Sequence, residues 1–220
     1  MTLQGKAREG RPAGILVSGG GTNMRALVRA AQSGDVHASV RVVVSNRPGV
    51  LALERAEALG VPTAVVDHTL FSTRDEFEAA LVTTLQSHGV EVVCLAGFMR
   101  ILGKQFIDAF DGRVLNVHPS ILPAFPGLHA ARQALEYGTR VAGCTVHLVT
   151  EEMDAGPILC QATVPVHEGD TEATLQARIQ VEEHRIYPKA LEWVCRDQVS
   201  FVGRRAVVHA PQDKTSDPAR

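Results

Sequence analysis

Three polar side chains in the second half of the sequence could act together on a carbonyl group. Asn116 and His118 lie two residues apart in the run 115–123, which begins as a short apolar strand and ends in a proline turn. Because residues i and i+2 of a strand point to the same face, the amide and the imidazole can address one substrate atom. Such a pair suits an acyl oxygen that gains negative charge during a reaction. Asp154, in the turn Asp-Ala-Gly-Pro, could hold the imidazole in its charged form.

A glycine-rich stretch near the N-terminus could bind a phosphate group. Residues 18–23 read Ser-Gly-Gly-Gly-Thr-Asn, between the first expected strand and the first expected helix. Glycines let backbone N–H groups approach an anion, and a helix N-terminus adds positive potential. The stretch lacks the Lys of a Walker loop and the last glycine of a dinucleotide fingerprint. A phosphate without a dinucleotide fits best, and a glycine turn needed only for packing is the alternative.

Alternating strand and helix patterns predict an α/β fold that positions these residues. We expect a doubly wound, mostly parallel sheet with an antiparallel part toward the C-terminus. The strands are expected at 13–18, 40–45, 63–66, 90–96, 114–117, 143–149 and 157–166, with a last pair around 199–208. The helices are expected at 23–33, 50–59, 74–87, 104–110, 129–137 and 171–187. This pattern predicts a single domain over 13–208, with flexible tails at 1–12 and 209–220.

Composition narrows the classes of function. The 220 residues are 45% hydrophobic and carry a net charge of −2, which gives no electrostatic case for nucleic acid or an anionic membrane. No segment approaches the roughly 18 apolar residues of a membrane span, and no signal peptide is recognisable. The four cysteines are widely spaced, which favours reduced thiols and a cytoplasmic location. Without a His-x-x-x-His pair or a Cys/His cluster, we expect no metal site.

Five segments, in this order, resemble the phosphoribosylglycinamide formyltransferase family. They are residues 18–23, 95–102 (Leu-Ala-Gly-Phe-Met-Arg-Ile-Leu), 115–120, 126–129 (Pro-Gly-Leu-His) and the Asp154-x-Gly-Pro turn, within a match that covers roughly 13–195. The resemblance implies a Rossmann-like formyltransferase fold. It also implies transfer of a formyl group from 10-formyltetrahydrofolate to the amine of glycinamide ribonucleotide in purine biosynthesis. The enzyme would use no metal and be a monomer or a homodimer.

The resemblance also implies roles for individual residues. Asn116, His118 and Asp154 match a catalytic trio, in which the first two stabilise a tetrahedral intermediate and Asp154 orients His118. The loop that binds the substrate phosphate is matched by Gly19, Gly20, Gly21, Thr22 and Asn23, and a glutamate that contacts the same substrate is matched by Glu183. The folate side is matched by Arg74, Met99, Arg100, Ile101, Leu102, Asn116, Thr150, Glu151, Glu152, Met153 and Asp154.

Two positions depart from the family pattern, because Ala131 and Ala142 stand where relatives often carry histidine. These departures concern peripheral contacts. His147 also recurs in the family, and the sequence leaves its role open.

Four other functions compete with this interpretation. A formyltetrahydrofolate hydrolase would use water in place of the amine, but that family typically has an extra N-terminal regulatory domain, and only 12 residues precede the first expected strand. Methionyl-tRNA formyltransferase would need a C-terminal RNA-binding domain and a basic surface. A non-catalytic phospho-sugar-binding protein gives no reason for Asn116, His118 and Asp154 to coexist. A nicotinamide dehydrogenase is disfavoured by the incomplete glycine fingerprint.

Overall fold

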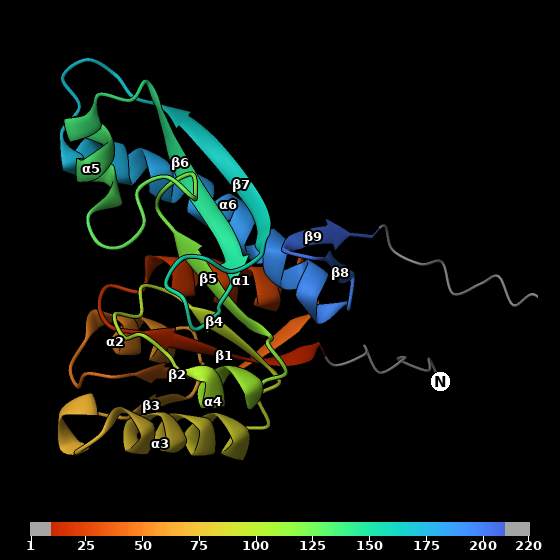
Figure 1. The fold of residues 1–220 in the computed structure, drawn as a ribbon. Helices are drawn as coiled ribbons and strands as arrows, with labels where there is room; N and C mark the ends of the chain where they lie inside the picture. The colour runs from red at the N-terminus through yellow and green to blue at the C-terminus, as the bar shows by residue number, and fades with distance from the viewer. Residues whose placement is uncertain (1–9, 210–220) are drawn as a thin grey trace, which may run out of the picture.

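A seven-stranded sheet forms the centre of the molecule in the computed structural model, which describes residues 10–209 (Figure 1). Its strand order is β3-β2-β1-β4-β5-β6-β7. The first five strands in this order pair in parallel, and the β5–β6 and β6–β7 pairs are antiparallel, which confirms the expected fold class. The strands are β1 (Arg11–Val17), β2 (Ala38–Ser45), β3 (Thr63–Val65), β4 (Val92–Leu95), β5 (Val114–His118), β6 (Val141–Leu148) and β7 (Ile158–Pro165).

Helices cover both faces of this sheet and bury two separate apolar clusters. One cluster joins the sheet to α1, α2, α5 and α6, and the other joins it to α3 and α4. The four residues of β4 are all buried, as expected of a strand covered on both faces. The helices are α1 (Thr22–Ser33), α2 (Leu51–Glu57), α3 (Arg74–Ser87), α4 (Lys104–Asp108), α5 (Ala130–Tyr137) and α6 (Glu172–Cys195), with a 3₁₀ turn η1 (His68–Leu70).

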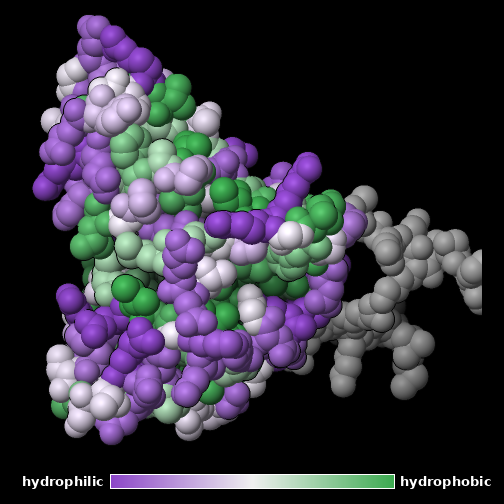
Figure 2. Space-filling model, viewed as in Figure 1, coloured by the Kyte–Doolittle hydropathy of each residue, from purple (hydrophilic) through white to green (hydrophobic). Residues whose placement is uncertain are grey.

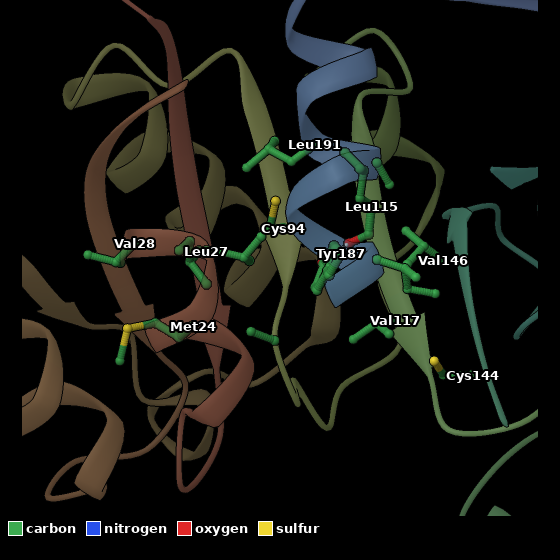
Figure 3. Packing of buried hydrophobic residues seen from close by; sticks show 14 of the residues in the cluster. Met24, Leu27, Val28, Cys94, Leu115, Val117, Cys144, Val146, Tyr187 and Leu191 are labelled. Carbon is green, nitrogen blue, oxygen red and sulfur yellow. Dashed lines mark hydrogen bonds between the residues drawn. The ribbon is translucent and has the colours of Figure 1, made fainter. Parts of the chain in front are cut away.

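The last helix is longer than its sequence pattern suggests. We expected it to end at 187, but α6 continues through Pro188 to Cys195. A proline inside a helix removes one hydrogen bond. Here the following turns bury Ala190, Leu191 and Val194 in the main core, and that burial outweighs the loss. Figure 3 shows this part of the core, with Tyr187 and Leu191 packed beside β4 and β5.

The two ends of the described chain lie close together. β1 begins at Arg11, two residues earlier than expected, and the Arg11 guanidinium forms an ion pair with Asp197, just beyond α6. The expected tail at 1–12 is therefore wrong for Arg11 and Pro12, which pair with β2. The backbone N–H of His209 donates to the carbonyl of Gln198, next to the hairpin of β8 (Val199–Val202) and β9 (Arg205–Val208). The expected tails at 1–9 and 210–220 lie outside the described residues.

Candidate active site

The candidate site lies where three parallel strands end. β1, β4 and β5 are followed by the segments 18–21, 96–103 and 119–129, and the connection between β6 and β7, residues 149–157, joins them. The sheet order changes direction between β1 and β4, because β2 and β3 extend one side and β5 the other. Open α/β sheets bind ligands at the carboxyl ends of strands near such a point. In Figure 2, apolar surface in the middle of the molecule is bordered by hydrophilic side chains above and below.

The structure brings His118 and Asp154 together across 36 positions of sequence. His118 Nδ1 lies 3.4 Å from Asp154 Oδ2, and both side chains are almost fully buried. The other ring nitrogen, Nε2, lies 2.9 Å from the carbonyl oxygen of Phe125. Both nitrogens therefore face oxygen acceptors, which suits an imidazolium, since both of its nitrogens carry hydrogens.

The backbone of the loop that carries Asp154 is constrained at two residues, Asp154 and Gly156. Asp154 adopts a left-handed conformation, with φ of 53°, and its Oδ2 accepts a 2.8 Å hydrogen bond from the N–H of Gly127. A Cβ at Gly156 would lie 1.7 Å from the carbonyl oxygen of Leu148, so only glycine fits there. The Asp-Ala-Gly-Pro turn therefore does more than reverse the chain, because it aims the carboxylate at His118.

A second histidine, His147, completes the polar face beside Asn116. The two residues are directly opposite in the antiparallel β5–β6 pair, and Asn116 Nδ2 lies 3.2 Å from His147 Nε2. His147 Nδ1 lies 2.9 Å from the carbonyl oxygen of Leu148, so Nδ1 carries the hydrogen and Nε2 can accept one from Asn116. Burial lowers the pKa of His147, which favours this neutral form. The sequence could not reveal the contact, because it depends on the register of two strands.

The three glycines of the loop differ in how much space surrounds their Cα atoms. Gly21 has φ of 75°, and a Cβ there would lie 2.7 Å from the Ala52 side chain. Among residues 10–209, a Cβ at Gly19 would meet nothing within 4 Å, and one at Gly20 would meet only the Arg55 guanidinium, 3.9 Å away. Packing therefore explains Gly21 but not Gly19 or Gly20, where the uncovered backbone can be approached by an anion.

The first turn of α1 meets α6 beside this loop. Asn23 Nδ2 donates to Glu183 Oε2 at 2.7 Å, and Thr22 Oγ1 accepts from Gln180 Nε2 at 2.8 Å. Glu183 is 3% exposed, and burial raises the pKa of its carboxyl, while the hydrogen bond from Asn23 opposes that rise. Asn23 Oδ1 is buried and has no hydrogen-bond partner among the described residues. The loop and the glutamate, matched separately in the sequence, thus form one polar group.

Exposed apolar side chains flank the trio on the side where the resemblance places folate. Met99 and Ile101 are each 57% exposed and Met153 is 56% exposed, so these three side chains offer apolar surface that a ligand could cover. Leu102, in contrast, is buried, so it can contribute only its backbone. Four further residues that the resemblance assigns to the folate side are exposed, namely Arg100, Thr150, Glu151 and Glu152.

The buried carboxylate of Glu78 links Arg74 to segment 96–103. Arg74 Nε lies 3.2 Å from Glu78 Oε1, which also accepts a hydrogen bond from the N–H of Gly103. Glu78 is 3% exposed, and nothing in the sequence pattern distinguishes it from the other charged residues of α3. It ties α3 to the end of segment 96–103.

A comparison with protein families decides the relationship. Residues 13–191 match the model of a family described as formyl transferase. The chain belongs to the formyl transferase family. A phosphoribosylglycinamide formyltransferase of Escherichia coli is 43% identical over 179 residues, which cover 81% of this chain and 84% of the relative.

Two further relatives show how far the likeness extends. The human trifunctional purine biosynthetic protein adenosine-3 is 45% identical over 187 residues, which cover 85% of this chain but 18% of the relative. This formyl transferase therefore spans less than a fifth of that protein. The crystal structure of glycinamide ribonucleotide transformylase 1 from Symbiobacterium toebii superimposes with a TM-score of 0.90 at 46% identity, covering 93% of this chain and 96% of the other.

The remaining expectations for this formyl transferase concern a metal site, a membrane span, the state of the cysteines and the two positions that depart from the family pattern. Among residues 10–209, no group of three or more His, Cys, Asp or Glu side chains could hold a metal ion. No helix in the same range is long and apolar enough to cross a membrane. All four cysteines are free thiols. Ala131 and Ala142 are both buried, so histidine would not fit there without repacking.

Proposed function

We propose that this formyl transferase moves the formyl group of 10-formyltetrahydrofolate to the primary amine of glycinamide ribonucleotide in de novo purine biosynthesis. One observation carries the proposal: the open glycine loop after β1 and the group of Asn116, His118 and Asp154 around the end of β5 lie at the same edge of one sheet, with β4 between the two strands. A nucleotide anchored by its phosphate at the loop can present its amine to a carbonyl held at the trio. The free thiols support a cytoplasmic enzyme. Whether it is a monomer or a homodimer stays a prediction.

The ribonucleotide would bind through the first turn of α1. Backbone N–H groups of Gly19, Gly20 and Gly21, with Thr22 and Asn23, would hold the phosphate at the helix N-terminus. Glu183 would accept hydrogen bonds from the sugar or the glycinamide part, with Asn23 already fixing one of its oxygens. The unpartnered Asn23 Oδ1 supports this assignment, because a buried acceptor without a donor is costly until a ligand supplies one.

The folate would lie across the apolar edge of the site. Met99, Ile101 and Met153 would cover its ring system, and the backbone of segments 99–102 and 150–154 would supply hydrogen bonds. Arg74, whose side chain is 55% exposed, would pair with a carboxylate of the folate tail.

The reaction would begin when the neutral amine attacks the formyl carbon. A carbon–nitrogen bond forms, and the formyl oxygen gains negative charge in a tetrahedral intermediate. Asn116 has one amide hydrogen directed at His147 and a second that can be donated to this oxygen. His118, as an imidazolium, would stabilise the same charge, with Asp154 holding the ring. The carbon–nitrogen bond to folate then breaks, and the proton lost by the amine passes to the folate nitrogen. Since His118 Nε2 faces the carbonyl of Phe125, that proton would travel through a water or after the ring turns.

A single assay tests the proposal. The protein is incubated with 10-formyltetrahydrofolate, and deformylation of the folate is followed with and without glycinamide ribonucleotide. We expect turnover only with the ribonucleotide present. Turnover with water alone would identify a hydrolase, and ligand binding without turnover would identify a phospho-sugar-binding protein. Either result overturns the proposed function.

A further inference from the structure

A serine hydroxyl connects the glycine loop to the folate side of the site. Ser18 directly follows β1 and precedes Gly19. Its Oγ accepts a 2.8 Å hydrogen bond from the backbone N–H of Met99, which lies beyond β4. The same hydroxyl donates to Asn46 Oδ1 at 2.6 Å, just beyond β2. Ser18 is 7% exposed and Asn46 is fully buried, so water does not compete for these bonds.

The direction of this hydrogen-bond chain is fixed by chemistry. A backbone N–H can only donate, so Ser18 Oγ must accept from Met99 and is left to donate its own hydrogen. Asn46 Oδ1 can only accept, and the other half of that amide, Nδ2, lies 3.3 Å from His68 Nδ1. Three strand ends are thereby joined at the point where the sheet order changes direction.

The segment that Ser18 holds has one apolar anchor next to Met99, because the Phe98 side chain is 8% exposed and packs in the cluster with α3 and α4. Gly97 adopts a left-handed backbone with φ of 73°, and a Cβ there would meet no atom of the described residues within 4 Å. The Met99 side chain is mostly exposed. The other anchors of the segment named above lie further along, where Leu102 is buried and Gly103 bonds to Glu78. Ser18 therefore supplies the hydrogen-bond acceptor that orients the Met99 amide, between the apolar anchor at Phe98 and the anchors at Leu102 and Gly103.

We propose that Ser18 is a positioning residue for folate binding, because its hydroxyl sets the Met99 backbone relative to the glycine loop. The inference rests on the proposed function, which places folate against segment 99–102. Without the hydroxyl, the segment would occupy its binding-competent position in only a fraction of molecules, and the apparent Kd for folate rises as that fraction falls. The glycine loop keeps its own backbone contacts, such as Gly19 accepting from Ala52, so binding of the ribonucleotide should change little.

The test compares Ser18→Ala with Ser45→Ala. Ser45 is a matched control, because it is fully buried at the end of the neighbouring β2 and the hydrogen bonds of its hydroxyl run to the backbone of Arg47, in its own turn. Binding of tetrahydrofolate and of glycinamide ribonucleotide is measured by titration calorimetry, and melting temperatures are recorded. We expect Ser18→Ala to raise the Kd for tetrahydrofolate roughly three- to tenfold, the effect of about one hydrogen bond, and to change the Kd for the ribonucleotide by less than about twofold. Ser45→Ala should leave both Kd values unchanged.

Other outcomes separate the possible explanations. A purely structural role for Ser18 predicts a lower melting temperature with both Kd values unchanged, and that result overturns the inference. An equal rise in both Kd values, or the same effect in Ser45→Ala, also overturns it. If Ser18→Ala does not fold, Ser18→Cys serves instead, since its thiol is a weaker acceptor and should give a smaller rise of the same selectivity.

The proposed function is judged separately on the unchanged protein. Wild-type protein that binds tetrahydrofolate but transfers no formyl group overturns the proposed function, while the comparison of Kd values still decides the role of Ser18. Wild-type protein that binds no tetrahydrofolate overturns both.

Discussion

At the scale of residues, the site consists of polar contacts between buried and half-buried side chains. His118 faces two oxygen acceptors, and Asn116 faces the unprotonated nitrogen of His147. Electrostatic interactions are stronger when water is excluded, so these contacts orient each group before a substrate arrives. The arrangement explains why a site without a nucleophile of its own can favour attack by an amine, since it stabilises the charge that the attack creates.

Removing either half of the His118–Asp154 pair should abolish most of the transfer. We expect His118→Ala and Asp154→Asn each to lower kcat by about 10²–10³, the usual cost of losing one oxyanion-stabilising group. The double variant should lose little more, because the two groups act as a unit. His129→Ala is a suitable control, since that histidine is exposed and pairs with Glu172. Near-normal kcat in either single variant, with the fold intact by circular dichroism, would contradict the assigned roles.

His147 should make the stability of the protein depend on pH. Burial lowers the pKa of His147 below its ordinary value of 6.5. As the pH falls through 6.5, the unfolded chain therefore takes up a proton that the folded protein resists, and the folded state loses stability. Denaturation with urea at about pH 7.5 and about pH 5.5 should show a larger loss for the wild type than for His147→Gln, which keeps an acceptor for Asn116 but does not titrate. Equal losses would show that His147 contributes nothing to the pH dependence.

At the scale of elements, each part of the site is held by a neighbouring strand or helix. α3 begins with a capping box of Thr73 and Glu76, which fixes its first turn beside Arg74. From the next turn, Glu78 accepts the N–H of Gly103 and so holds segment 96–103. A Cβ at Gly103 would lie 2.6 Å from the Arg74 guanidinium, which shows how closely the helix approaches the segment.

Glu78 should therefore matter for both stability and folate binding. We expect Glu78→Ala to lower the free energy of unfolding by about 1–3 kcal/mol, because a buried N–H loses its acceptor. The freed segment should also raise the Kd for tetrahydrofolate. Glu78→Gln keeps an acceptor for Gly103 and should recover most of the stability. If both variants are equally destabilised in urea, the charge pair with Arg74, and not the bond to Gly103, is the important contact.

The sequence predicted elements well and contacts between them poorly. Hydrophobic periodicity located nearly every strand and helix, and α3 begins and ends where the pattern does. It failed at Pro188, because local propensity cannot count the core burial that keeps α6 intact beyond it. The meeting of Asn116 with His147 and of Ser18 with Met99 was not predictable either. Both contacts depend on which strands are neighbours and in what register, and that information lies in the tertiary fold.

At the scale of the whole molecule, the C-terminal hairpin returns to the site formed by the central strands. β9 packs beside β7, and its turn places Arg204 at the loop of Asp154, where the guanidinium donates to the carbonyl oxygen of Ala155. The hairpin lies beyond residues 13–191, the range that matches the family model. A segment outside that range thus contacts the loop that carries the carboxylate.

Loss of this contact should loosen the Asp154 loop without unfolding the protein. Because Arg204 is exposed and makes one hydrogen bond to the loop, we expect Arg204→Ala to raise the Kd for tetrahydrofolate only about two- to threefold, with a similar fall in kcat. Arg205→Ala is the matched control, since it removes the same charge from the next residue. If the two variants behave alike, the effect comes from surface charge. A change confined to Arg204→Ala, accompanied by faster amide hydrogen exchange in residues 150–156, would show that the hairpin holds the loop over the site.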